Sequence, residues 1–242
     1  MKEEHIDIQT QDGAMNTFIT RPDEGGPFPA VLFYMDAPGK REELHDMARR
    51  IATAGYYVML PNLYYRDVRE FHLGMADATR ERMFELMDHL SNAMVCEDTQ
   101  AMFDHMAQEP DARGGPVGIT GYCMSGPFVF AAAAAFPDRI KAAASVHGVK
   151  LYTDAADSPH LNADKIQGEM YFACAELDQL APPSMIDPLD AHLKETGINY
   201  RIEWYPAAQH GFVFPQRDGM FSKESAERHW SRLFAMFERN VR

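Results

Sequence analysis

Cysteine is scarce in this chain, and residues in the spacings that bind metals or cofactors are missing. Among 242 residues there are three cysteines, Cys96, Cys123 and Cys174. An odd number at wide spacing forms neither a disulfide framework nor a zinc motif. The ten histidines show no H-E-x-x-H spacing, and neither G-x-G-x-x-G nor a P-loop occurs. We therefore expect no metal, no cofactor and reduced thiols, as suits a cytoplasmic protein.

Positive charge and long apolar runs are also in short supply. The formal net charge of −13 at pH 7 argues against a nucleic-acid partner, because phosphate contacts need a basic face, and it disfavours anionic membranes. No apolar run is long enough to span a bilayer, and the polar start, Met1 to His5, lacks the apolar core of a signal peptide. We expect a cytoplasmic monomer or small homo-oligomer whose partner is a small molecule, since local charge governs a pocket.

Apolar strands alternate with helical segments along most of the chain. Residues 6–10 and 15–20 alternate apolar and polar side chains around Asp12-Gly13, which predicts an antiparallel hairpin. Continuous apolar runs then alternate with helical periodicity, which predicts a mostly parallel central sheet with helices on both faces. The expected strands are 30–34, 57–60, 117–120, 171–175 and 200–205, and the expected helices are 40–54, 97–108, 127–136 and 224–239. The length suits a single α/β domain over residues 1–242.

One long insertion, residues 66–94, interrupts this alternation. It is rich in methionine and carries Phe71 and Phe84. Methionine adapts to irregular surfaces, so the segment could form a lid or cap over a substrate. A helix packed on the edge of the sheet explains the same pattern.

The clearest motif is a glycine-flanked turn, G-Y-C-M-S-G, at residues 121–126. It follows a strand-like run and precedes an alanine-rich helix, which is the setting of a nucleophile elbow. Cys123 occupies the reactive position, where the amino end of the helix favours a thiolate. Ser125 stands where a second glycine is usual. The alternative is a cysteine that serves as a small core residue.

A cysteine nucleophile needs a base, and the base needs a carboxylate that orients it. Asp178 follows the strand 171–175, with Glu176 as a second candidate, and His210 follows the strand 200–205. The chain order nucleophile, acid, histidine is that of α/β-hydrolases. Taken singly, Asp178 could be a turn residue and His210 a surface-loop histidine.

With these residues in place, the chain resembles the dienelactone hydrolases (carboxymethylenebutenolidases), a cysteine-nucleophile branch of the α/β-hydrolase fold. The resemblance rests on residues 121–123, 176–178 and 209–212, and an earlier stretch, 33–39 followed by 54–64, adds to it. It implies that Cys123 attacks an ester or lactone carbonyl to form an acyl-enzyme, that His210 moves the proton and that Asp178 orients the imidazole. It also implies an oxyanion hole formed by the backbone N–H groups of Ala37 and Met124.

Several positions depart from the family pattern. Asp36 stands where the family has a glutamate that interacts with the resting thiol, so we expect it to gate the thiol; a helix-start role is the alternative. The family holds a substrate carboxylate with arginines, for which Arg80 is preferred here over Arg82. After His210 the chain has Phe212 and Phe214, with no basic residue before Arg217. We therefore expect a larger or less charged substrate, with Phe212 in the pocket.

His147 closes another predicted strand at the same edge of the sheet. It could contact substrate, line the pocket or be a hydrogen-bonded core histidine. Two other functions stay open beside ester or lactone hydrolysis: a non-catalytic member of the fold that uses Cys123 as an oxidisable thiol sensor, and a thioesterase that acts on a larger acyl carrier. A sensor needs no aspartate–histidine pair, and a basic rim for a phosphorylated carrier is not evident.

Overall fold

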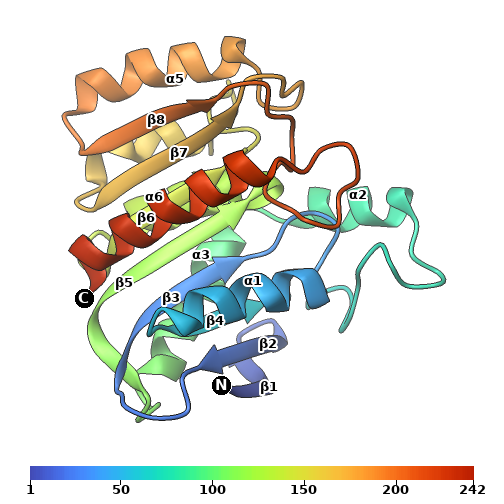
Figure 1. The fold of residues 1–242 in the computed structure, drawn as a ribbon, viewed down its shortest axis with the longest axis vertical. Helices are drawn as coiled ribbons and strands as arrows, with labels where there is room; N and C mark the ends of the chain where they lie inside the picture. Colours follow the sequence, from blue (N-terminus) through green and yellow to red (C-terminus); the bar gives the residue numbers. More distant parts are fainter.

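The structure, a computed structural model, describes residues 1–242 and is built on one eight-stranded sheet (Figure 1). The strand order is β1-β2-β4-β3-β5-β6-β7-β8. The strands are β1 (Lys2–Thr10), β2 (Gly13–Arg21), β3 (Phe28–Tyr34), β4 (Tyr57–Pro61), β5 (Ala112–Tyr122), β6 (Ile140–Val146), β7 (Glu169–Ala175) and β8 (Tyr200–Tyr205). The pairs from β4 through β8 are all parallel. The predicted mostly parallel sheet is confirmed.

The predicted hairpin at the amino terminus is confirmed as well. β1 and β2 pair antiparallel, with Thr10 opposite Gly13 across the turn, and β2 continues the antiparallel pairing onto β4. β1 begins four residues earlier than the alternation predicted, because main-chain pairing with β2 extends past the apolar residues. The central strands are buried on both faces, as continuous apolar runs such as Ala30 to Tyr34 require.

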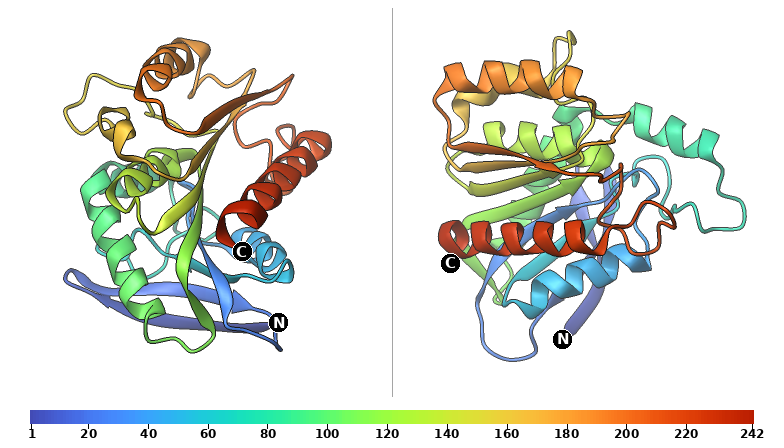
Figure 2. Two further views of the ribbon diagram at one scale, coloured as in Figure 1. Left: turned by 90° about the vertical axis from the view of Figure 1, so that its left-hand side faces the viewer. Right: turned by 45° about the horizontal axis from the view of Figure 1, so that its top comes forward.

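Helices cover both faces of the sheet (Figure 2). α1 and α6 lie on one face, and α3 and α4 lie on the other. The helices are α1 (Glu42–Thr53), α2 (Arg80–His89), α3 (Asn92–Met106), α4 (Gly126–Ala135), α5 (Pro183–Thr196) and α6 (Lys223–Val241), with short 3-10 turns η1 (Cys123–Ser125) and η2 (Pro159–Lys165). None of these helices has the length and apolar character needed to cross a membrane.

The insertion at 66–94 contains α2 and ends in the first turn of α3. α3 begins five residues earlier than predicted because the side chain of Ser91 caps it, accepting a hydrogen bond from the N–H of Met94 at 3.2 Å. α2 lies beyond the carboxyl ends of the strands (Figure 1). Met83 and Leu86 are buried in it, whereas Phe84 is half exposed. Whether this segment moves as a lid stays a prediction.

Candidate active site

The cysteine at the predicted elbow lies between a central strand and a helix. β5 ends at Tyr122, Cys123 opens the turn η1, and α4 follows directly. Cys123 has a φ of +55°, a conformation that is costly for a residue with a side chain and persists only where its surroundings impose it. Its side chain is buried apart from a small exposed fraction of 9%. The geometry is that of a nucleophile elbow at the carboxyl end of the sheet.

Close packing explains why this turn tolerates serine at position 125. A Cβ on Gly121 would lie 2.6 Å from Cγ2 of Val129, so no side chain fits there. The second close approach falls one residue later than usual, since a Cβ on Gly126 would overlap the Cα of Gly148. Ser125 is free to carry a side chain, and its hydroxyl donates to the carbonyl of Met35 at 2.5 Å.

We predict that Gly126→Ala destabilises the protein by about 1–3 kcal/mol, as forced overpacking usually does. The added methyl group would push α4 away from Gly148. Gly114→Ala is the matched control, because a Cβ on Gly114 meets no atom within 4 Å. Urea unfolding of both variants measures the difference. Equal stability of the two would contradict the packing argument.

His210 and Asp178 are brought together from two different loops. Nδ1 of His210 lies 2.7 Å from Oδ2 of Asp178. The other carboxylate oxygen accepts the N–H groups of Leu180 and Ala181 at 2.8 and 3.1 Å, which fixes the orientation of the carboxylate. The second candidate, Glu176, instead accepts the N–H of Ala207 at 2.8 Å. Of the two acids, only Asp178 is placed to orient the imidazole.

The surroundings of His210 favour its protonated form. Burial lowers the pKa of the imidazole, but interactions with Asp178 and with Cys123 outweigh burial and raise the pKa to about 9. Nε2 is buried and makes no well-formed hydrogen bond, so it remains available on the side of the thiol. A proton can therefore be held on this ring at neutral pH.

His147 lies against the ring of His210. Its ring centroid is 4.6 Å from that of His210 and 5.9 Å from that of Phe212. Neither ring nitrogen has a hydrogen-bond partner, so the expectation of a hydrogen-bonded core histidine is wrong. Burial first, and then the charge at His210, hold the pKa of His147 well below its ordinary value. This ring, which stays neutral, packs against the imidazole of His210.

The predicted oxyanion donors lie on two adjacent turns. The N–H of Ala37 makes no hydrogen bond within the chain, which leaves it free for a ligand oxygen. The carbonyl of Ala37 accepts the hydroxyl of Tyr64 at 2.8 Å, and the same hydroxyl lies 3.2 Å from Sδ of Met124. Tyr64 thus joins the two turns that carry the donors. The position of Tyr64 after a strand in the sequence gave no indication that it contacts both turns.

Asp36, the residue expected to gate the thiol, is fully buried and is engaged by arginines. Oδ1 accepts a hydrogen bond from Arg41 at 2.5 Å, and Oδ2 is paired with Arg217. Arg41 also pairs with Glu43 at 2.6 Å, and Glu43 accepts the N–H of Gln216 at 2.8 Å. These contacts connect the turn before Ala37 to the loop after His210. Whether Asp36 also restrains the thiol stays a prediction.

Two other residues expected to contact substrate, Phe212 and Arg80, have different surroundings from those predicted. Phe212 has no exposed surface and packs on Tyr205, with ring centroids 4.8 Å apart, so it belongs to the core rather than to a pocket. Arg80 is exposed at the start of α2 and forms no ion pair, while Arg82 pairs with Glu85 at 3.0 Å. Chain order alone did not reveal which side of each loop faces the thiol.

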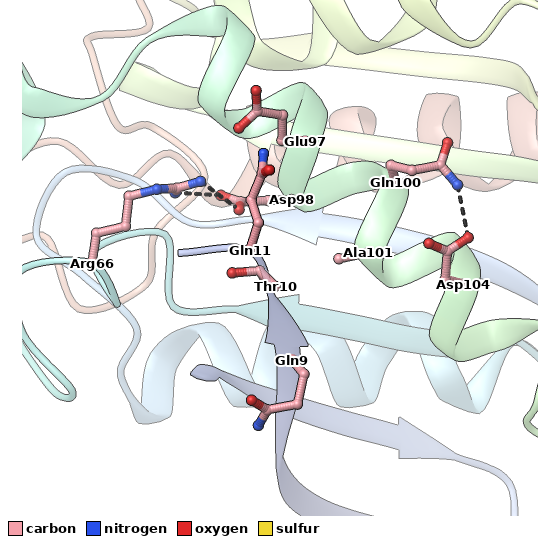
Figure 3. A pocket seen from close by; sticks show the side chains of 9 residues that line it. All are labelled: Gln9, Thr10, Gln11, Arg66, Glu97, Asp98, Gln100, Ala101 and Asp104. Carbon is pink, nitrogen blue, oxygen red and sulfur yellow. Dashed lines mark hydrogen bonds and ion pairs between the residues drawn. The ribbon is translucent and has the colours of Figure 1, made fainter. Parts of the chain in front are cut away.

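A polar cavity lies elsewhere in the molecule. It has a volume of 290 Å³ and is formed by the β1–β2 turn, Arg66 and α3 (Figure 3). Asp98 lies at its centre but already pairs with Arg66 at 2.9 Å and accepts the hydroxyl of Tyr65 at 2.8 Å. None of the predicted site residues lines this cavity, so we assign it a structural role.

A second buried histidine, His229, contacts the end of β5 and makes the stability of the protein depend on pH. His229 has no exposed surface and meets the hydroxyl of Tyr122 at 3.2 Å through Nε2. Burial lowers its pKa to about 3. The unfolded chain, with an ordinary histidine pKa near 6.5, binds this proton more readily than the folded protein.

We predict that this histidine makes stability fall as pH drops from about 6.5 toward 3, by at most about 1.4 kcal/mol per pH unit. His229→Gln should flatten that part of the profile because glutamine does not titrate. The exposed His89, changed to Gln, is the control for removing a histidine from the surface. Denaturant unfolding at a series of pH values measures the slope. An identical slope in His229→Gln and wild type would count against this account.

Comparison with known proteins places the whole chain. Residues 15–241 match the dienelactone hydrolase family. A "Putative carboxymethylenebutenolidase" of Synechocystis is 26% identical over 98% of this chain and 96% of its own length, and a protein of the same name from Methylorubrum extorquens is 27% identical over 94% and 78%. Among solved structures, a "Putative Dienelactone Hydrolase" from Klebsiella pneumoniae is similar with a TM-score of 0.87, at 24% identity and 98% coverage of both chains. A dienelactone hydrolase-like promiscuous phosphotriesterase, P91, from metagenomic libraries has a TM-score of 0.79 at 18% identity, covering 100% of this chain and 99% of its own. This chain belongs to the dienelactone hydrolase family.

Proposed function

We propose that this protein hydrolyses small carboxylic esters or lactones through an acyl-enzyme on Cys123. The observation that carries the proposal is the convergence of three groups at one edge of the sheet. Cys123 has the backbone conformation of an elbow, His210 interacts with it, and Asp178 holds the far side of the imidazole at 2.7 Å. Family membership adds support, since relatives carry the name carboxymethylenebutenolidase.

In the first half of the proposed reaction, the sulfur attacks the carbonyl carbon as the thiolate, its proton residing on Nε2 of His210. The negative charge moves to the carbonyl oxygen, where the N–H groups of Ala37 and Met124 would donate hydrogen bonds. As the tetrahedral intermediate collapses, the bond to the ester oxygen breaks. The imidazolium gives its proton to the departing alkoxide, which leaves a thioester on Cys123.

In the second half, His210 takes a proton from water as the water attacks the thioester. The carbon–sulfur bond then breaks, the acid is released, and the thiolate–imidazolium pair returns. Asp178 remains ionised throughout and stabilises the charged ring. The pKa of about 9 at His210 suits these roles, because the ring holds a proton in the resting pair yet can release it to an alkoxide.

No contact in the structure favours the thiol-sensor alternative over hydrolysis. The aspartate–histidine pair would be unnecessary for it, and Asp36 is engaged with arginines rather than with the sulfur. A thioesterase for a large carrier would need a surface that recognises the carrier. The net charge of −13 offers little attraction to a phosphorylated one.

Turnover of p-nitrophenyl acetate by the purified protein tests the proposal directly. We expect release of p-nitrophenol together with an adduct of 42 Da, about the mass of an acetyl group, on the peptide that contains Cys123 after acid quenching. Absence of turnover with aryl esters and lactones alike would favour the sensor.

A further inference from the structure

A cavity of 230 Å³ opens directly beside the elbow. Part of its lining is apolar, formed by Met87, Leu90, Met124, Pro127, Phe128 and Val149, and the rest is polar, including Ser91, Asn92, Thr153 and Ser158. Three segments meet there: the end of the 66–94 insertion, the start of α4 and the turn after β6. The cavity is unrelated to the polar one at α3, since the two share no lining residue.

Two features connect this cavity with Cys123, the residue that would carry the acyl group: a neighbour in the chain and a hydrogen bond. Met124 follows Cys123 in the chain and lines the cavity. The N–H of Val149 donates to the carbonyl of Cys123 at 3.2 Å, so the opposite wall is attached to the same residue. No residue of the loops that carry Asp178 and His210 contributes to the lining. The leaving oxygen must face His210, so a cavity on the other side of Cys123 would receive the acyl part of the ester.

The size of the cavity and its apolar part, which includes Met124 next to Cys123, favour an apolar group. A cavity of about 150 Å³ lined by aliphatic and aromatic side chains is known to hold benzene, so 230 Å³ has room for a phenyl ring or a short alkyl chain. Methionine walls adapt to such groups at low cost. Met87 lies on α2, the helix beyond the carboxyl ends of the strands (Figure 1).

The charges at the mouth do not favour an anionic acyl group. Lys150 is the only basic residue of the lining, and its Nζ lies 4.0 Å from Oδ1 of Asp88 on α2. Asp157 adds a second carboxylate to the same rim. Lys150, Asp88 and Asp157 together carry a net charge of −1, so a carboxylate entering the cavity would meet repulsion rather than a free cation.

We propose that this cavity is the acyl-binding site and that it takes an uncharged aryl or medium-chain acyl group, with Met87 as a wall that limits chain length. The assignment rests on the proposed function, because it presumes an acyl group on Cys123. It names the substrate class as neutral aryl or alkyl esters and lactones.

The test is a series of p-nitrophenyl esters that differ only in the acyl group: acetate, hexanoate, octanoate, benzoate and monosuccinate. Each kcat/KM is divided by the rate of alkaline hydrolysis of the same ester, to remove intrinsic reactivity. We expect hexanoate and benzoate to exceed acetate and monosuccinate by about tenfold or more. Met87→Ala should raise the octanoate-to-hexanoate ratio severalfold by lengthening the cavity. Phe84→Ala, on the exposed side of the same helix, should leave that ratio at the wild-type value.

Three outcomes would overturn the assignment while leaving the proposed function intact. These are a preference for monosuccinate, equal corrected rates across the series, or a Met87→Ala ratio equal to that of Phe84→Ala. A parallel series of acetate esters of different alcohols shows which half of the ester the cavity binds. If kcat/KM depended on the chain length of the alcohol and not on that of the acyl group, the cavity would be a leaving-group site. Loss of the proposed function has a different signature, namely no turnover of any ester that depends on Cys123.

Discussion

Cys123→Ala is expected to lower kcat/KM for aryl ester hydrolysis by about 10⁴-fold or more. The sulfur is the group at the elbow that would bond to the substrate carbon, since the hydroxyl of Ser125 is engaged with the carbonyl of Met35, and the alanine variant lacks this covalent path. The strained backbone at this position and the interaction with His210 are the reasons to place the chemistry there. Stopped-flow release of p-nitrophenol measures the effect.

A second cysteine provides the matched control for this experiment. Cys96 is also partly buried, but burial raises the pKa of its thiol to about 11, which leaves it almost wholly protonated at neutral pH. Cys96→Ala should retain wild-type turnover. Full activity of Cys123→Ala, or equal losses in the two variants, would rule out the proposed nucleophile.

Asp36→Asn is expected to cost about 3–5 kcal/mol of folding free energy, the usual result of removing one partner from a buried ionic network. Arg41 and Arg217 are only 14% and 20% exposed; Arg217 would lose its one carboxylate partner, and Arg41 would keep only Glu43. Guanidine unfolding gives the value. Asp46→Asn is the control: this aspartate is exposed on α1 and pairs with Arg49 at 2.7 Å, so its loss should cost at most about 1 kcal/mol.

The same variant separates the ionic network from the thiol gate. If Asp36 restrained the thiol, iodoacetamide would alkylate Cys123 faster in Asp36→Asn than in the wild type, under conditions where both proteins are folded. The contacts with the two arginines predict no such increase. Stability of Asp36→Asn within about 1 kcal/mol of wild type would show that the network contributes little.

Most of the sheet could be predicted because its signals are local. A run such as Ala30 to Tyr34 can only be buried on both sides, and Asp12-Gly13 between alternating segments turns back on itself. The order of Cys123, Asp178 and His210 was equally readable, since each follows a strand and the carboxyl ends of parallel strands share one edge. Helix ends were less readable: α3 begins where Ser91 caps it rather than where the apolar pattern starts.

The identity and order of the chemical groups were determined by the sequence alone: a thiol in a glycine-flanked turn, then an acid, then an imidazole, on an α/β scaffold. Only the tertiary structure decided what surrounds them. Asp36 meets Arg217 across 181 positions of the chain, and Phe212 turns into the core instead of toward a ligand. The physical reason is that periodicity and strand order report burial and direction, whereas the pairing of charges depends on distances between loops that no local pattern encodes.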